Sequence, residues 1–166
     1  MWLSDRRKVL GGLLGALALS ACGFTPAYGP GSPAAGLLDR VEIDAPADRR
    51  AFDLVERLEE RLGRADSPAY GLSYRIDVQS ENRTITPTNA ITRYNLNGRV
   101  HYTLRDLQSD RVLTEGDVTT FTSYSASGTP VATNASETDA GLRLMRLLAD
   151  QIVTRLIASS GEWGGT

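Results

Sequence analysis

The chain has 166 residues, of which 41% are hydrophobic and 23% charged, and its formal net charge is −2. This length suits one domain, and the composition is that of an ordinary globular protein. The lack of a basic excess argues against nucleic acid as a partner, and a single cysteine excludes an internal disulfide bond.

Residues 1–21 have the features of a secretory signal peptide. Three basic residues at positions 6–8 precede residues 9–19, a segment that carries no charge. Eleven helical residues would span only about 16 Å, which is too short to cross a hydrocarbon core of about 30 Å. We therefore expect this segment to be removed rather than to span a membrane. The paired Arg6 and Arg7 leave open whether export follows the general secretory or the twin-arginine route.

The residues at 19–22, Leu-Ser-Ala-Cys, resemble the lipobox of bacterial lipoproteins, in which an aliphatic residue and two small residues precede a cysteine. The resemblance implies that acyl chains such as palmitate are attached at Cys22 and that cleavage before Cys22 makes it the first residue of the mature protein. Several acyl chains hold a protein on a membrane far more firmly than one chain does. Gly23 stands where an aspartate would resemble an inner-membrane retention signal, so the resemblance favours the outer membrane, on its periplasmic face.

The segment at 22–36 is rich in glycine and proline and has no pattern for packing. We expect it to be a tether between the lipid anchor and a single domain at residues 37–160. Phe24 and Tyr28 either only lengthen this tether or rest at the membrane interface or on a partner.

Alternation of apolar and polar residues predicts four strands, at residues 38–43, 74–78, 91–105 and 112–124. Helical spacing predicts a first helix that Asp48 caps and Gly63 ends. After a polar loop at 125–133, Ser136 and Asp139 occupy reciprocal capping positions that open a second helix.

The predicted order is β-α-β-β-β-α, followed by a frayed end that includes a flexible tail at 161–166. This order indicates an α+β fold in which two helices pack on one face of a mostly antiparallel four-stranded sheet. The other face of the sheet would be polar and open.

The polar turn at residues 106–110 predicts a hairpin between the last two strands. If Leu104 pairs with Val112, opposite charges face each other across the hairpin and fix its register. The facing pairs would be Arg99 with Asp117 and His101 with Glu115.

Catalytic chemistry finds little support in this sequence. The only histidine, His101, lies in a predicted strand, and Ser123 and Ser125 have no histidine base nearby in sequence. We therefore expect no enzymatic activity, no metal and no cofactor.

The polar sheet face carries arginines whose forked guanidinium groups suit carboxylates and phosphates. They are candidates for contacts with an anionic ligand, and the alternative is a solvated face on which they pair with Asp77, Glu115 and Asp117. The candidate residues are Arg75, Arg93, Arg99 and Arg105.

Several features together resemble the LptE family of lipopolysaccharide-assembly lipoproteins. They are "ACGFTPAYG" at the lipobox, the β-α-β-β-β-α order, "TSYSASGTPVATNASETDAGLR" and the closing helix "LMRLLADQIVTRLI". The resemblance implies a protein of the outer membrane's inner leaflet that plugs the β-barrel LptD, helps to assemble it and contacts lipopolysaccharide. Two other functions stay open, an auxiliary lipoprotein of an envelope lipid-transporting ABC system and a lipid-tethered periplasmic hydrolase.

Overall fold

The computed structural model describes residues 29, 33–85, 91–126 and 129–163. The signal peptide, Cys22, Phe24 and Tyr28 therefore lie outside the described residues, as does most of the expected tether. Within the tether range, residues 33–36 form a 3-10 turn.

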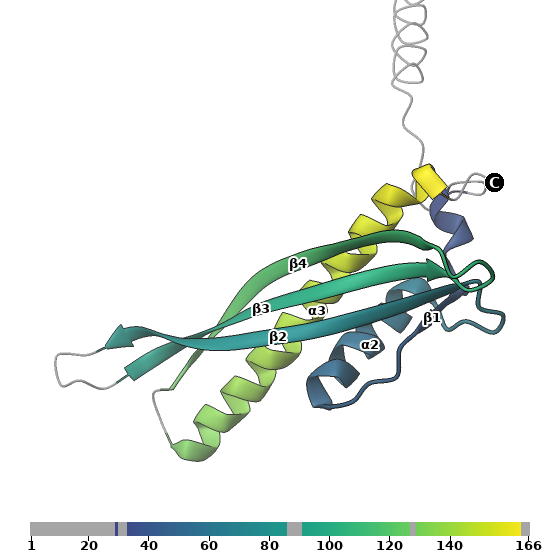
Figure 1. Ribbon diagram of the computed structural model, residues 1–166. Coiled ribbons are helices and arrows are strands. Elements are labelled where there is room, and N and C mark those ends of the chain that lie inside the picture. The colour runs from purple at the N-terminus through teal and green to yellow at the C-terminus, as the bar shows by residue number, and fades with distance from the viewer. Residues whose placement is uncertain (1–28, 30–32, 86–90, 127–128, 164–166) are drawn as a thin grey trace, which may run out of the picture.

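The described chain forms one four-stranded sheet with two long helices on the same face (Figure 1). This arrangement confirms the predicted α+β fold and its element order. The elements are η1 (Pro33–Gly36), β1 (Val41–Ile43), α2 (Arg49–Leu62), β2 (Tyr70–Ile85), β3 (Ile91–Asp106), β4 (Val112–Ser125) and α3 (Pro130–Trp163).

The strands lie in the order β1-β2-β3-β4. The β2–β3 and β3–β4 pairs are antiparallel, whereas β1 and β2 run parallel, so the sheet is mixed. The parallel pair follows from the connection between them, because parallel neighbours need a crossover and α2 supplies it.

The core lies between the sheet and the two helices, where alternate strand residues meet the apolar stripes of α2 and α3. Every second residue of β3 faces this core, as the alternation predicts. Fully buried members include Leu72, Val100, Leu104, Val118, Leu54, Leu58, Leu144, Leu148, Ile152 and Leu156.

Helix α2 has the predicted ends. The Asp48 carboxylate accepts a hydrogen bond from the Ala51 N–H at 2.8 Å, which satisfies one of the free donors of the first turn. At the other end Gly63 has a φ of +81°, and its N–H donates to the Glu59 carbonyl at 2.9 Å. A residue with a side chain is strained at that φ, so glycine suits the helix end.

Helix α3 is longer at both ends than predicted. It begins at Pro130, not at Ser136, because Thr129 accepts a hydrogen bond from the Ala132 N–H through Oγ1 and proline suits the first helical position. Ser136 therefore lies inside the helix, where its hydroxyl donates to the Ala132 carbonyl.

At its C-terminal end α3 continues to Trp163, so residues 161–163 of the expected flexible tail are helical. The Trp163 ring meets the Tyr70 ring edge to face at a centroid distance of 5.6 Å. Such aromatic packing explains why the last turn does not fray.

The predicted register between β3 and β4 is wrong by two residues. His101 lies opposite Asp117, Thr103 opposite Glu115, and Arg99 opposite Thr119. The Asp106 N–H bonds the Arg111 carbonyl at 3.0 Å and closes a wider turn, and a β-bulge follows between Leu104 and Arg105. A shift by two moves no side chain to the other face, so the alternation holds from Arg93 to Leu104 although the predicted pairs do not.

Candidate functional site

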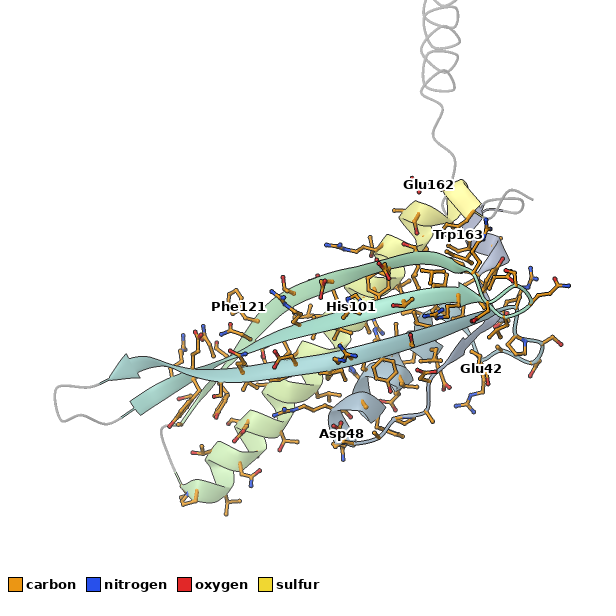
Figure 2. The ribbon with its side chains drawn as sticks, in the orientation of Figure 1. Glu42, Asp48, His101, Phe121, Glu162 and Trp163 are labelled. Atoms are coloured by element: carbon orange, nitrogen blue, oxygen red, sulfur yellow. The ribbon has the colours of Figure 1, made fainter. Side chains whose placement is uncertain are left out.

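The open face of the sheet carries the candidate arginines. Strands β2 and β3 turn their even-numbered residues toward the helices, so the odd-numbered ones face away from them. Arg75, Arg93, Arg99 and Arg105 all occupy odd positions and are exposed. Figure 2 shows this face, with His101 and Phe121 labelled. All four arginines thus share one surface, as expected.

These arginines do not form a single cluster. Arg75 lies opposite His101, and Asp77 lies opposite Arg99, so Arg75 and Arg99 are diagonal neighbours across the two strands. Arg93 and Arg105 each lie six residues from Arg99 along β3, which is about 20 Å in a strand. Only Arg75 and Arg99 can therefore contact the same small anionic group.

Acidic side chains partly balance this charge. The His101 Nδ1 atom lies 3.5 Å from the Asp117 carboxylate, and the Arg105 guanidinium lies 3.8 Å from Asp110. Asp77 stands directly opposite Arg99 across the strand pair. Pairs as exposed as these contribute at most about 1 kcal/mol, so an anionic ligand can compete for the arginines.

A shallow depression of about 600 Å³ lies beside Arg99 on the open face. Asn97 of β3 lines it, together with Gln79, which lies opposite Asn97 on β2, and Phe121, which lies opposite Asn97 on β4. Phe121 is 62% exposed. Asp77 and Thr119 line the depression too, so this surface combines amide and charged groups with one aromatic ring, which suits binding of a polar partner or ligand.

Phe121 is not among the residues that the sequence pattern marks as candidates for the site. The available signal was its position, since it is a bulky apolar residue with threonine on both sides in a strand whose alternation is irregular. Val118, Thr122 and Tyr124 face the core, and only this arrangement shows that Phe121 lies on the exposed side of β4.

His101 has no arrangement that supports catalysis in the described part of the chain. It shares a small open hollow with Ser73 and Thr103, but the Ser73 hydroxyl donates to the Thr103 carbonyl at 3.4 Å. Among residues 33–85, 91–126 and 129–163, no three or more His, Cys, Asp or Glu residues come close enough to hold a metal ion.

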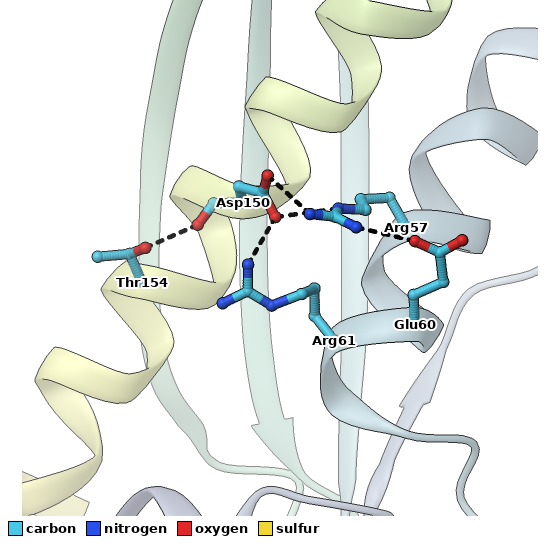
Figure 3. Close-up of polar contacts among 5 residues, drawn as sticks. All are labelled: Arg57, Glu60, Arg61, Asp150 and Thr154. Carbon is cyan, nitrogen blue, oxygen red and sulfur yellow. Dashed lines mark hydrogen bonds and ion pairs between the residues drawn. The ribbon is translucent and has the colours of Figure 1, made fainter. Parts of the chain in front are cut away.

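The charge pattern of the helices is also explained without a ligand. Asp150 of α3 accepts hydrogen bonds from Arg57 and Arg61 of α2, and Arg57 also donates to Glu60 (Figure 3). These residues join the two helices to each other.

No helix in the described ranges has the length and apolar character needed to cross a bilayer.

Comparison with known proteins agrees with the fold. An uncharacterized protein of Rickettsia prowazekii, RP188, is 27% identical over 139 residues, which cover 84% of this chain and 88% of that protein. A candidate lipoprotein of Caulobacter crescentus CB15 has a similar crystal structure, with a TM-score of 0.66 at 22% identity, covering 78% of this chain and 96% of that one.

The rare lipoprotein B of Shewanella oneidensis shares the fold at a TM-score of 0.58 and 13% identity, over 74% of this chain and 96% of that one. The family model LptE, described as lipopolysaccharide-assembly, matches residues 38–156, which is most of the chain and nearly the whole described domain. The chain therefore belongs to the LptE family of lipopolysaccharide-assembly proteins.

Proposed function

We propose that this chain is a lipoprotein of the outer membrane, anchored through Cys22 on the periplasmic face, that plugs the lumen of an LptD-like β-barrel and helps to assemble it. The observation that carries the proposal is the family match over residues 38–156. The interior of such a barrel is polar, and the open sheet face supplies a polar surface that suits it.

We further propose that lipopolysaccharide contacts this open face through Arg75 and Arg99. The lipid A part of lipopolysaccharide carries phosphates, which arginine forks bind with two hydrogen bonds. The two residues are diagonal neighbours and exposed, so one phosphate can be reached from both strands. Arg93 and Arg105 lie too far along β3 to join that contact and would touch other parts of a large ligand.

The partner is tested by purifying the tagged full chain from detergent-solubilised envelope. We expect a large outer-membrane β-barrel to co-purify with it, identified by mass spectrometry. A permease complex in its place would contradict the barrel proposal and favour an auxiliary role in lipid transport by an ABC system.

The anchor is tested with Cys22→Ala. Without the sulfur no acyl chain can be attached, so we expect the variant to keep its signal peptide and to lose the mass of the lipid. Intact mass spectrometry of the purified chain measures both changes. An unchanged mass in Cys22→Ala, or an unlipidated wild-type chain, would contradict the anchor.

A further inference from the structure

One end of the domain has a surface of its own, separate from the open sheet face. Here the turn η1, the start of β2, the β3–β4 turn and the end of α3 meet (Figure 1). They enclose a cavity of about 490 Å³. We call this end the basal surface and define it by Arg40, Tyr70, Leu107, Arg111 and Trp163, which all line the cavity.

The basal surface is amphipathic. Leu107 is 48% exposed, although its side chain is apolar. Tyr70 and Trp163 line the same cavity and form the edge-to-face pair described above; Figure 2 labels Trp163 at this end. Tyrosine and tryptophan concentrate where protein meets the headgroup region of a membrane, because their rings are apolar and their tips are polar.

Two guanidinium groups border the same cavity. The Arg40 guanidinium lies over the Tyr70 ring, 5.6 Å from its centroid, and Arg111 lines the same cavity. Both side chains are exposed, and neither takes part in an ion pair within 4 Å in the part of the chain that the structure describes. Asp106 faces the cavity too, but its carboxylate accepts hydrogen bonds from Gln108 and Ser109 of its own turn.

The chain leading from Cys22 reaches the domain at this end. Thirteen residues lie between Cys22 and Gly36, and Gly36 itself lines the basal cavity. Even a fully extended chain of that length spans at most about 50 Å, and an unstructured one averages about 20 Å. The tether from Cys22 therefore enters the domain at the basal surface and is short enough to let this surface touch the bilayer that holds the anchor.

We propose that the basal surface docks on the phospholipid head groups of the membrane that holds the anchor. Leu107 and the Tyr70–Trp163 pair lie at the boundary between head groups and acyl chains, and Arg40 and Arg111 donate hydrogen bonds to lipid phosphates. The inference rests on the proposed lipid anchor. It adds an orientation, since docking fixes which way the open sheet face points.

The test uses Trp163 as a built-in probe. The chain has two tryptophans, Trp2 and Trp163, so the Trp2→Phe chain carries only the one on the basal surface whether or not it is processed. This chain, purified from membranes, is reconstituted into vesicles of phosphatidylethanolamine and phosphatidylglycerol, some made with lipids brominated near the glycerol end of the acyl chains. Bromine quenches only nearby tryptophan, so we expect strong loss of Trp163 emission in the brominated vesicles.

The basal variant Arg40→Gln/Arg111→Gln should reduce this quenching several-fold, while Arg146→Gln/Arg155→Gln, on the exposed side of α3, should leave it unchanged. Equal quenching of both variants would overturn the role of the two guanidinium groups. Circular dichroism checks that both variants are folded.

Vesicle flotation separates the anchor from the docking. A chain that floats with the vesicles but shows no quenching of Trp163 would overturn the docking and leave the anchor in place. A chain that does not float at all would overturn the lipid anchor, and the docking with it.

Discussion

Gly98 sets the distance between helix α3 and the sheet. It lies in the middle of β3 on the face that meets the helices. A Cβ atom built at this position would lie 2.9 Å from Leu148 Cδ1 and 3.0 Å from Leu144 Cδ2. Both leucines are fully buried, so neither can move aside without disturbing its other neighbours.

Replacing Gly98 by alanine should therefore destabilise the fold by about 1–3 kcal/mol, the usual cost of overpacking a core. Chemical unfolding in urea measures this change. Gly141→Ala is the matched control, because nothing lies within 4 Å of its added Cβ and alanine is the better helix former by about 1 kcal/mol. The control should unfold at a higher urea concentration than the wild type. A Gly98→Ala chain as stable as the wild type would show that α3 can shift without cost.

The charge of Asp106 in the β3–β4 turn makes the stability of the fold depend on pH. Its carboxylate accepts hydrogen bonds from the Ser109 N–H at 2.7 Å, the Ser109 hydroxyl at 2.8 Å and the Gln108 N–H at 3.0 Å. These bonds, the Ser109 N–H first among them, favour the charged form and lower the pKa of Asp106. A carboxyl group whose pKa is lower in the folded chain than in the unfolded chain stabilises the fold at pH values above its unfolded pKa. This stabilisation is lost as the pH falls through the folded pKa.

We expect Asp106→Asn to be less stable than the wild type at neutral pH, with the difference shrinking once the pH falls below about 4. Urea unfolding at several pH values measures it. Asp110→Asn, in the same turn, should change stability less, because the Asp110 side chain is 90% exposed. A difference that stays constant down to low pH would contradict a role for the Asp106 charge.

At the scale of elements, α2 and α3 are joined by one carboxylate that two arginines share. Asp150 of α3 lies 3.1 Å and 3.2 Å from two nitrogens of Arg57 and 2.9 Å from Arg61 (Figure 3). Two parallel hydrogen bonds from one guanidinium fix the direction of the contact. The side chains are only about one third exposed, so water screens this contact less than it screens a fully exposed pair.

Asp150→Asn should lower the melting temperature by a few degrees, a shift typical of losing one modest interaction in a domain of this size. The matched control is Asp139→Asn in the same helix, whose 3.1 Å pair with Arg143 is more than half exposed and should contribute little. Thermal unfolding followed by circular dichroism compares the two. Equal melting temperatures would mean that apolar packing alone holds α2 against α3.

The elements that local chemistry determines could be predicted from the sequence. Asp48 and Gly63 mark the ends of α2 because both act on backbone groups within one turn. The start of α3 was missed because residues 130–139 are mostly exposed and have no apolar stripe to reveal a helix. The β3–β4 register was missed because it depends on a bulge and a wide turn, which side-chain alternation does not report.

At the scale of the whole molecule, the two helices cover one side of the sheet and leave the other side open (Figure 1). The alternation of β2 and β3 was enough to place the four candidate arginines on that open side. The pairing of three strands was needed to show how far apart these arginines lie and that Asn97 and Phe121 are neighbours. The basal surface combines four segments that are far apart in sequence, so no single stretch could reveal it.

Exposed residues on the open polar face contribute little to the stability of the fold, so they can be replaced without unfolding it. The proposed ligand contact can therefore be tested separately from folding. In Arg75→Gln/Arg99→Gln both exposed side chains lose their charge but keep most of their length, and stability should change by less than about 1 kcal/mol. We expect this variant to retain several-fold less lipopolysaccharide than the wild type when both are purified from envelope. Arg146→Gln/Arg155→Gln removes the same charge from α3 and should retain the wild-type amount. Equal retention by all three chains would place the anion contacts outside the Arg75–Arg99 pair.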